Sequence, residues 1–128
     1  MNSAVLYLVF NRVDETKQSF VTIKKAKPTR LYIAADGPRN SVVGEREICE
    51  SVRKIATNVD WDCEVYTLFR ETNLGCKTAI VSAIDWFFDN ESEGIILEDD
   101  IVPKTDFFEF CDIMLDKYRN ENLVKAVS

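Results

Sequence analysis

Short apolar runs alternate along this chain with stretches in which apolar residues recur at helical spacing. The apolar runs predict strands at residues 4–10, 30–37, 63–69 and 94–97, and residues 122–128 indicate the start of a fifth strand. Strands that alternate with helices of ordinary length are typical of a parallel sheet. We therefore expect an α/β fold in three layers, a mostly parallel sheet with helices on both faces.

Helical spacing predicts four helices between these strands. The first is capped by Asp14 and ends before Lys27-Pro28, and the third opens at Asn73-Leu74-Gly75. The apolar positions assigned to the four helices are, in order, Phe20, Val21 and Ile23; Val43, Ile48, Val52 and Ile55; Ala79, Ile80, Ala83, Ile84, Phe87 and Phe88; and Phe107, Phe108, Phe110, Cys111, Met114, Leu115 and Tyr118.

Length and charge narrow the class of protein. The chain has 128 residues, of which 46% are hydrophobic, and this suffices for one core, so we expect one domain over residues 1–128. Its 16 basic and 22 acidic residues give a net charge of -6, which disfavours a nucleic-acid partner. No apolar stretch approaches the length of a membrane span and no leader is evident, so we expect a soluble, cytoplasmic protein.

The cysteines and the missing histidine limit the chemistry. Cys49, Cys63, Cys76 and Cys111 are scattered without a C-x-x-C pair, which indicates reduced and mostly buried thiols. The chain has no histidine, so a Ser-His-Asp or Cys-His system and a His-ligated metal are excluded within it. Any chemistry here must use carboxylates, lysine and arginine.

Polar residues follow each of the first four predicted strands. They are Asn11-Arg12, Asp36-Gly37, the segment from Arg70 to Lys77, and the triplet Glu98-Asp99-Asp100. In an open parallel sheet, ligands bind beyond the carboxyl ends of the strands. We therefore expect these residues to surround a binding site.

The acidic triplet needs a source of positive charge. Neighbouring carboxylates at a partly buried strand end repel one another by roughly 2 to 4 kcal/mol at an effective dielectric near 20. Side chains alternate along a strand, so Glu98 and Asp100 are expected on one face and Asp99 on the other, which suits a divalent cation and a hydroxyl-rich ligand. Arg12 and Lys77 could neutralise phosphates on that ligand. The simpler alternatives are acids that solvate a strand exit, a surface ion pair at Arg12, an ordinary turn at Asp36-Gly37 and a structural role for Arg70.

Four segments of the chain resemble glycosyltransferases of the GT-A fold, the group that includes N-acetylglucosaminyltransferase I and the family-2-like enzymes of bacterial polysaccharide synthesis. The segments are VLYLVFNR, LYIAADGPR, ETNLGCKTAIVSAIDWFFD and GIILEDDIVPKTDFFEFC. The last resembles the D-x-D-type acidic motif of the family in an E-D-D form. Together they span nearly the whole chain.

The resemblance implies a role for each matching residue. Asp100 would contact a Mn²⁺ or Mg²⁺ ion bound to the diphosphate of a UDP- or GDP-sugar, with Glu98 and Asp99 near the ribose and sugar. Arg12 and Asp36 would lie around the base and phosphates, and Lys77 would approach the diphosphate. Asn11 and Gly37 are neighbours that shape the backbone there. The acceptor would be the hydroxyl of a saccharide or glycan.

The chain is shorter than the family leads one to expect. Enzymes of the GT-A fold take their acceptor site and catalytic base from the half that follows the acidic motif, so no catalytic residue is assigned here. The chain is similar to the N-terminal, nucleotide-sugar-binding part of a longer domain. An unfinished sheet leaves an edge that could pair with another copy and form a homo-oligomer.

Other classes stay open. A nucleotidyltransferase would need a glycine-rich basic loop after the first strand, where this chain has FNRVDET. A phospho-receiver signalling domain would need acids after the first strand and an aspartate after the third, where the chain has Asn11-Arg12 and Arg70. An α/β interaction domain without catalysis is the third alternative.

Overall fold

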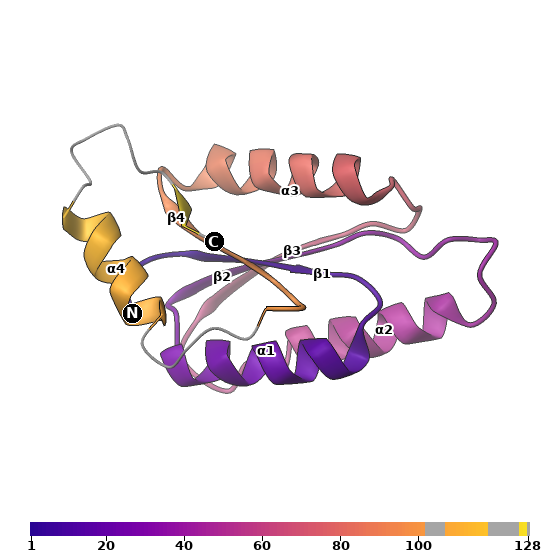
Figure 1. Ribbon diagram of the computed structural model, residues 1–128, viewed down its shortest axis with the longest axis horizontal. Coiled ribbons are helices and arrows are strands. Elements are labelled where there is room, and N and C mark those ends of the chain that lie inside the picture. Colours follow the sequence, from indigo (N-terminus) through magenta and orange to yellow (C-terminus); the bar gives the residue numbers. More distant parts are fainter. Residues whose placement is uncertain (102–106, 118–125, 128) are drawn as a thin grey trace.

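The computed structural model describes residues 1–101, 107–117 and 126–127. Along the chain the elements are β1 (Val5–Val9), α1 (Val13–Ala26), β2 (Arg30–Ala35), α2 (Glu45–Ala56), β3 (Glu64–Phe69), α3 (Cys76–Asn90), β4 (Gly94–Glu98), α4 (Phe107–Lys117) and β5 (Ala126–Val127) (Figure 1). The alternation of strands and helices predicted from the apolar pattern is confirmed.

All strand pairs of the sheet are parallel, in the order β3-β2-β1-β4-β5. The first strand is therefore central, and its Val5 pairs with Leu31 on one side and with Ile95 on the other. Strands β1, β2 and β4 are mostly buried on both faces, which explains why their sequences are continuous apolar runs. The predicted fifth strand is present at Ala126–Val127.

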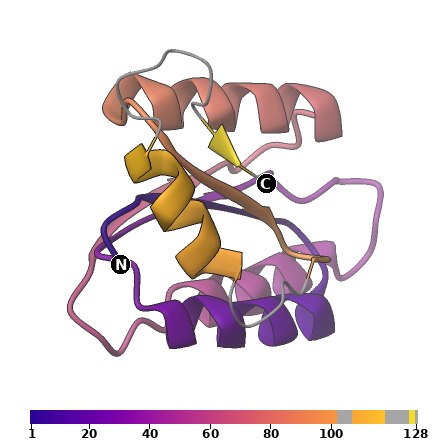
Figure 2. The ribbon, with the colours of Figure 1, turned by 60° about the vertical axis from the view of Figure 1, so that its left-hand side comes forward.

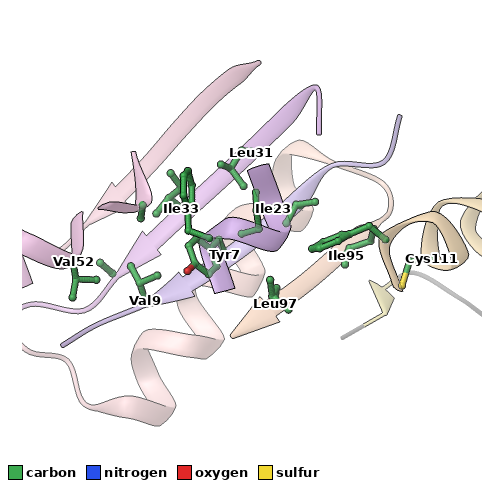
Figure 3. Close-up of a cluster of buried hydrophobic side chains, with 14 of the residues drawn as sticks. Tyr7, Val9, Ile23, Leu31, Ile33, Val52, Ile95, Leu97 and Cys111 are labelled. Carbon is green, nitrogen blue, oxygen red and sulfur yellow. The ribbon is translucent and has the colours of Figure 1, made fainter. Parts of the chain in front are cut away.

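Helices cover both faces of the sheet, so the expected three-layer arrangement is confirmed. On one face, side chains of α1, α2 and α4 pack with Val5, Tyr7 and Val9 in the larger cluster of buried residues, part of which Figure 3 shows. On the other face α3 packs through Ala83 and Phe87 in a smaller cluster. Figure 1 shows α3 on the side of the sheet opposite α1 and α2, and Figure 2 shows α4 from another direction. Alternate residues of β1 thus reach the two clusters, as the pleat of a strand requires.

Several details of the predicted helices are wrong. Helix α1 starts at Val13, and its N-cap is Arg12 rather than Asp14, which lies in the first turn. Val21 is half exposed because the buried face of α1 runs through Thr16, Ser19, Phe20 and Ile23. In α4, Phe110 is 56% exposed, whereas Phe108, Cys111 and Leu115 are buried. Tyr118 lies outside the described residues.

The predicted buried face of helix α2 is half right, because Val52 is buried and Ile55 packs against the core. Val43 precedes the helix and is 100% exposed, and Ile48 is exposed as well. The buried positions are Glu45, Cys49, Val52 and Ala56. A charged residue therefore begins the buried stripe, and its hydrogen bonds, described below, explain how it is tolerated.

The cysteines are all free, as expected. Cys49 and Cys111 are buried, but Cys63 is only partly buried and Cys76 is exposed. The expectation that most of the thiols are buried therefore holds for half of them. None of the helices in the described part of the chain is long and apolar enough to cross a membrane.

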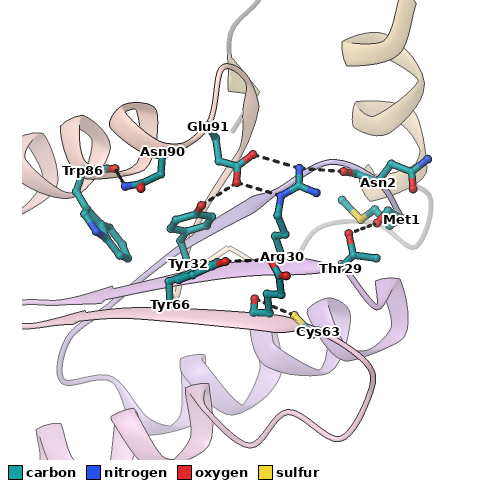
Figure 4. Close-up of polar contacts among 11 residues, drawn as sticks. Met1, Asn2, Thr29, Arg30, Tyr32, Cys63, Tyr66, Trp86, Asn90 and Glu91 are labelled. Atoms are coloured by element: carbon teal, nitrogen blue, oxygen red, sulfur yellow. Dashed lines mark hydrogen bonds and ion pairs between the residues drawn. The ribbon is translucent and has the colours of Figure 1, made fainter.

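Polar contacts hold α3 and α4 at the edge of the sheet where the strands have their N-terminal ends. Glu91, just after α3, accepts hydrogen bonds from Arg30 Nε at 3.0 Å and from the Tyr32 hydroxyl at 2.7 Å (Figure 4). Asp112 of α4 accepts a bond of 2.8 Å from the backbone N–H of Ser3. These contacts fix the helices at this end and leave the opposite end of the strands to the loops that form the site.

Candidate functional site

A pocket of about 420 Å³ lies at the carboxyl ends of β1, β2, β3 and β4, against the beginning of α3. Its apolar wall consists of Leu8, Val9, Phe10, Ala34, Ala35, Leu68, Ala79, Ile80 and Ala83. Its other lining residues are Asn11, Arg12, Asp36, Arg39, Arg70, Asn73, Gly75, Cys76, Glu98, Asp99 and Asp100. An apolar wall with convergent polar groups is typical of small-molecule sites.

The strand order explains why the pocket lies here. β1 and β4 are neighbours, but from β1 the chain continues towards the β3 edge, and from β4 towards the β5 edge. The connections therefore diverge beyond the carboxyl ends of β1 and β4, which is where ligands bind in open α/β sheets. Arg12 and the acidic triplet follow these two strands.

The acidic triplet forms the end of β4 and a turn. Glu98 is the last residue of the strand, and its carbonyl accepts a 3.2 Å bond from the N–H of Ile101. The N–H of Asp99 donates to the carbonyl of Leu8 at 3.1 Å, which fastens the turn to β1. Glu98 and Asp100 are exposed and Asp99 is buried, so the triplet is divided as the alternation predicted, although Asp99 and Asp100 belong to the turn.

Asp99 is the buried acid of the triplet, with 9% of its surface exposed. Burial raises its pKa, the charge of Arg12 opposes this, and the charges of Asp100 and Glu15 add to it, so that the pKa is about 6. Positive charge brought near a buried carboxyl group favours its ionised form and lowers its pKa.

Arg12 supplies part of that positive charge in the present structure. Its Nη1 lies 3.0 Å from Asp100 Oδ2, and both side chains are about half exposed. The contact raises the pKa of the Arg12 guanidinium. The surface ion pair considered from the sequence is thus present, and it is formed with a residue of the predicted site.

Asp36 holds the loop before α3 to the end of β2. Its Oδ1 accepts bonds of 2.8 Å from the N–H groups of Gly37 and Leu74. Its Oδ2 accepts bonds of 3.1 Å from the N–H of Gly75 and from Asn73 Nδ2. The carboxylate is therefore occupied by this loop, and its negative charge lies at the positive end of the α3 dipole.

Gly37 is required by the close approach of the same loop. A Cβ at this position would lie 2.4 Å from the backbone carbon of Thr72. Gly37 does not line the pocket, and neither does Lys77, which is exposed on the first turn of α3. Asn11, Arg12, Asp36, Glu98, Asp99 and Asp100, the remaining predicted site residues, do line it.

Glu45 organises the loop between β2 and α2, a role that sequence reasoning missed. Its carboxylate is 2% exposed and accepts bonds from Arg39 Nε at 2.9 Å, Arg39 Nη2 at 2.6 Å and Asn11 Nδ2 at 3.3 Å. These contacts, those with Arg39 first, lower the pKa of Glu45 to about 2. The available signal was its place on one helical face with Cys49, Val52 and Ala56.

Arg53 joins the ends of β2 and β3. Its Nη2 donates to the carbonyl of Asp36 at 3.1 Å and to that of Arg70 at 2.7 Å, and its guanidinium lies over the ring of Phe69. The backbone of Arg70 is thus fixed, whereas its side chain lines the pocket. The place of Arg70 after the third predicted strand was the signal in the sequence for this residue, whereas no pattern distinguishes Arg53 from the other arginines.

The carboxylates could contribute to a cation site but could not complete one. Among residues 1–101, 107–117 and 126–127, no group of three or more Asp, Glu, Cys or His side chains is arranged to hold a metal ion. A hard cation held by one or two carboxylates takes its other ligands from phosphate and water. The donor set fits an ion that arrives with a phosphorylated ligand.

Comparisons of the chain with known protein families, with curated proteins and with solved structures gave no match.

Proposed function

We propose that this chain is the part of a glycosyltransferase that binds a nucleotide-diphospho-sugar through a divalent cation. The observation that carries the proposal is the pocket beyond β1 and β4, in which the buried Asp99 and the half-exposed Asp100 lie beside Arg12. An apolar wall for a ring system borders it on the α3 side. A ligand with a ring at one end and phosphates with a cation at the other fits this division.

Asp100 is the residue that would hold Mn²⁺ or Mg²⁺, because its carboxylate lines the pocket and is exposed. The ion would supply positive charge that stabilises the departing diphosphate. The resemblance of the EDD segment to the acidic motif of GT-A enzymes supports this assignment.

The other pocket residues bind and orient the ligand. Arg12 is placed to exchange its contact with Asp100 for one with a phosphate. Glu98 and Asp99 are acceptors for sugar and ribose hydroxyls. Asp36 and Gly37 act indirectly, since they hold the loop that carries Asn73 and Gly75 into the wall. The base that deprotonates the acceptor hydroxyl is proposed to lie outside these residues.

The test is calorimetric titration of UDP and of GDP, each with and without Mn²⁺, into the wild type and Asp100→Ala. We expect binding of one nucleotide that requires Mn²⁺ and is lost in the variant. Removing Asp100 opens only a half-exposed ion pair, so the fold should be little affected. Asp89→Ala, at an exposed position near the far end of α3, is the matched control and should bind like the wild type.

Absence of Mn²⁺-dependent binding to either nucleotide in the folded wild type would contradict the proposal. Binding that survives Asp100→Ala unchanged would contradict the assignment of the cation ligand. Circular dichroism of all three proteins establishes that a loss of binding is not a loss of structure.

A further inference from the structure

We propose that Arg70 binds the base of the nucleotide and selects a base with carbonyl oxygens, uracil or guanine, over adenine. This inference rests on the proposed function, because it assumes that a nucleotide occupies the pocket. It assigns the residue that recognises the end of the ligand opposite the carboxylates.

The first argument is that the charge of Arg70 is not used by the protein. Three arginines line the pocket, and two of them are paired, Arg12 with Asp100 at 3.0 Å and Arg39 with Glu45 at 2.6 Å. Within the part of the chain that the structure describes, Arg70 forms no ion pair, and its one side-chain hydrogen bond goes to Ser82 Oγ at the long distance of 3.5 Å. Its guanidinium therefore retains donors for a ligand.

The second argument is that the backbone of Arg70 is held firmly. Its N–H donates to the carbonyl of Ala35 at 3.0 Å, and its carbonyl accepts the 2.7 Å bond from Arg53. Arg53 in turn lies over the ring of Phe69, 4.9 Å from the centroid. The guanidinium is therefore carried on a backbone that is already in place, so binding need not order the main chain at this position.

The third argument is the place of Arg70 in the pocket. It follows β3, which is separated from β4 by β2 and β1, so at about 4.8 Å per strand the two strand ends are about 14 Å apart. Under the proposed function the cation and the phosphates lie beyond β4. The base then falls towards β3, where Leu68, Ala79 and Ala83 provide an apolar wall for a ring.

A guanidinium is a donor without any acceptor, and this decides which bases it suits. Uracil presents two carbonyl oxygens, and guanine presents O6 beside N7, the pair that arginine binds with two hydrogen bonds. Adenine shares the N7 acceptor but presents an amino group where guanine has O6, so it can accept only one of the two hydrogen bonds from Arg70. The Asp36 carboxylate, which already accepts four N–H bonds, is not available to reverse this preference.

The test compares UDP, GDP and ADP, each in the presence of Mn²⁺, as ligands of the wild type and of Arg70→Met. Methionine keeps an apolar stem in the wall and removes the donors. The wild type should bind UDP or GDP more tightly than ADP. The variant should bind its preferred nucleotide about tenfold to a hundredfold more weakly, the usual effect of losing hydrogen bonds to a charged group, and should lose much less affinity for ADP.

Arg46→Met is the matched control, because Arg46 is exposed on α2 and does not line the pocket. It removes the same charge and should leave all three affinities unchanged. Thermal unfolding of both variants reports whether the loss of Arg70 has altered the fold.

The outcomes separate this inference from the proposed function. An equal loss for all three nucleotides in Arg70→Met would mean that Arg70 binds phosphate, and it would overturn the assignment to the base. Mn²⁺-dependent binding of UDP or GDP that Arg70→Met leaves intact would overturn the inference and keep the function. If the wild type binds none of the nucleotides, both are wrong.

Discussion

At the scale of single residues, Asp99 makes the stability of the protein depend on pH. Burial holds its pKa at about 6, above the ordinary value of 3.8, so between these values the folded chain binds more protons than the unfolded chain. Stability should therefore fall as the pH rises from about 4 to 6 and remain lower above that. Asp99→Asn should flatten this slope, which urea denaturation at several pH values in this window would measure.

Glu45 acts in the opposite sense and over a lower range. Its pKa is lowered from 4.5 to about 2, so the stability it contributes is complete above pH 4.5 and is lost as the pH falls towards 2. Measurements from pH 4.5 upwards therefore isolate Asp99. Asp89→Asn serves as the control, and a slope that is equally steep in Asp99→Asn and in the control would contradict the assignment to Asp99.

Gly37 gives the second prediction at this scale. Alanine would bring its Cβ to 2.4 Å from the backbone of Thr72, so the loop that Asp36 holds must move. Gly37→Ala should lower the free energy of unfolding by about 1–3 kcal/mol, the usual cost of overpacking, in a chemical denaturation experiment.

The comparison for Gly37 is Gly44→Ala. At Gly44 φ is +81° and a Cβ would meet nothing within 4 Å, so the cost there is backbone strain of about 1 kcal/mol without any clash. Nucleotide binding should be weakened in Gly37→Ala, because its loop carries part of the pocket wall, and unchanged in Gly44→Ala. Equal effects of the two substitutions on stability and binding would contradict this account of the loop.

The sequence predicts some residues of the site and misses others for a physical reason. Arg12 and Asp100 could be found because they follow apolar strands, and strand ends converge in a parallel sheet. Glu45 could not be found, because a buried carboxylate can be recognised only from its hydrogen-bond partners. Those partners, Arg39 and Asn11, are brought next to it by the fold. The unpaired charge of Arg70 is likewise a property of its surroundings.

At the scale of elements, α3 depends on one aromatic side chain. Phe87 is fully buried and packs edge-on against Tyr32 and Phe88, with distances between ring centroids of 4.9 Å and 5.1 Å. Its ring also occupies the space that a Cβ at position 94 would need. No other helix in the described residues packs in its cluster. Phe87→Ala should therefore destabilise the protein by about 3–5 kcal/mol, measured by thermal or denaturant unfolding.

Phe110→Ala is the control for this prediction, since it makes the same change at an exposed position of α4. It should cost well under 1 kcal/mol. A Phe87→Ala protein about as stable as Phe110→Ala would mean that α3 contributes little to the core.

A strand or helix could be predicted from the sequence where burial alone determines its pattern of apolar residues. Strands β1, β2 and β4 have continuous apolar sequences because both faces are covered. The face of α2 was predicted only in part, because Val52 and Ile55 pack in the core whereas Val43 and Ile48 are apolar but exposed. Which apolar residues of a helix are buried depends on how the helix is rotated about its axis. In α2 the hydrogen bonds of Glu45 favour the observed rotation, and the sequence of the helix does not show these bonds.

At the scale of the whole molecule, the sheet has an unprotected edge. Among the residues that the structure describes, β3 pairs only with β2, and Val65 and Tyr66 on it are exposed. Unpaired backbone groups on such a strand can add a strand from a second copy. We expect the chain to self-associate with rising concentration, and Val65→Lys to suppress this, in sedimentation velocity experiments.

Val81→Lys is the matched control for association, because Val81 is exposed on α3, away from the edge strand. It should leave the association unchanged. A monomer at every concentration, or equal suppression by both substitutions, would show that the β3 edge is not the contact.

The central place of β1 has a consequence for how the protein is made. As the chain is synthesised, β1 can pair with β2, and β2 with β3, while the other edge of β1 stays open. That edge is closed only when β4 appears and pairs Val5 with Ile95, a contact between distant parts of the sequence that forms slowly. The pocket needs the ends of both strands, so a nascent chain cannot form its binding site before β4 has paired, and a ligand that fills the site stabilises that pairing.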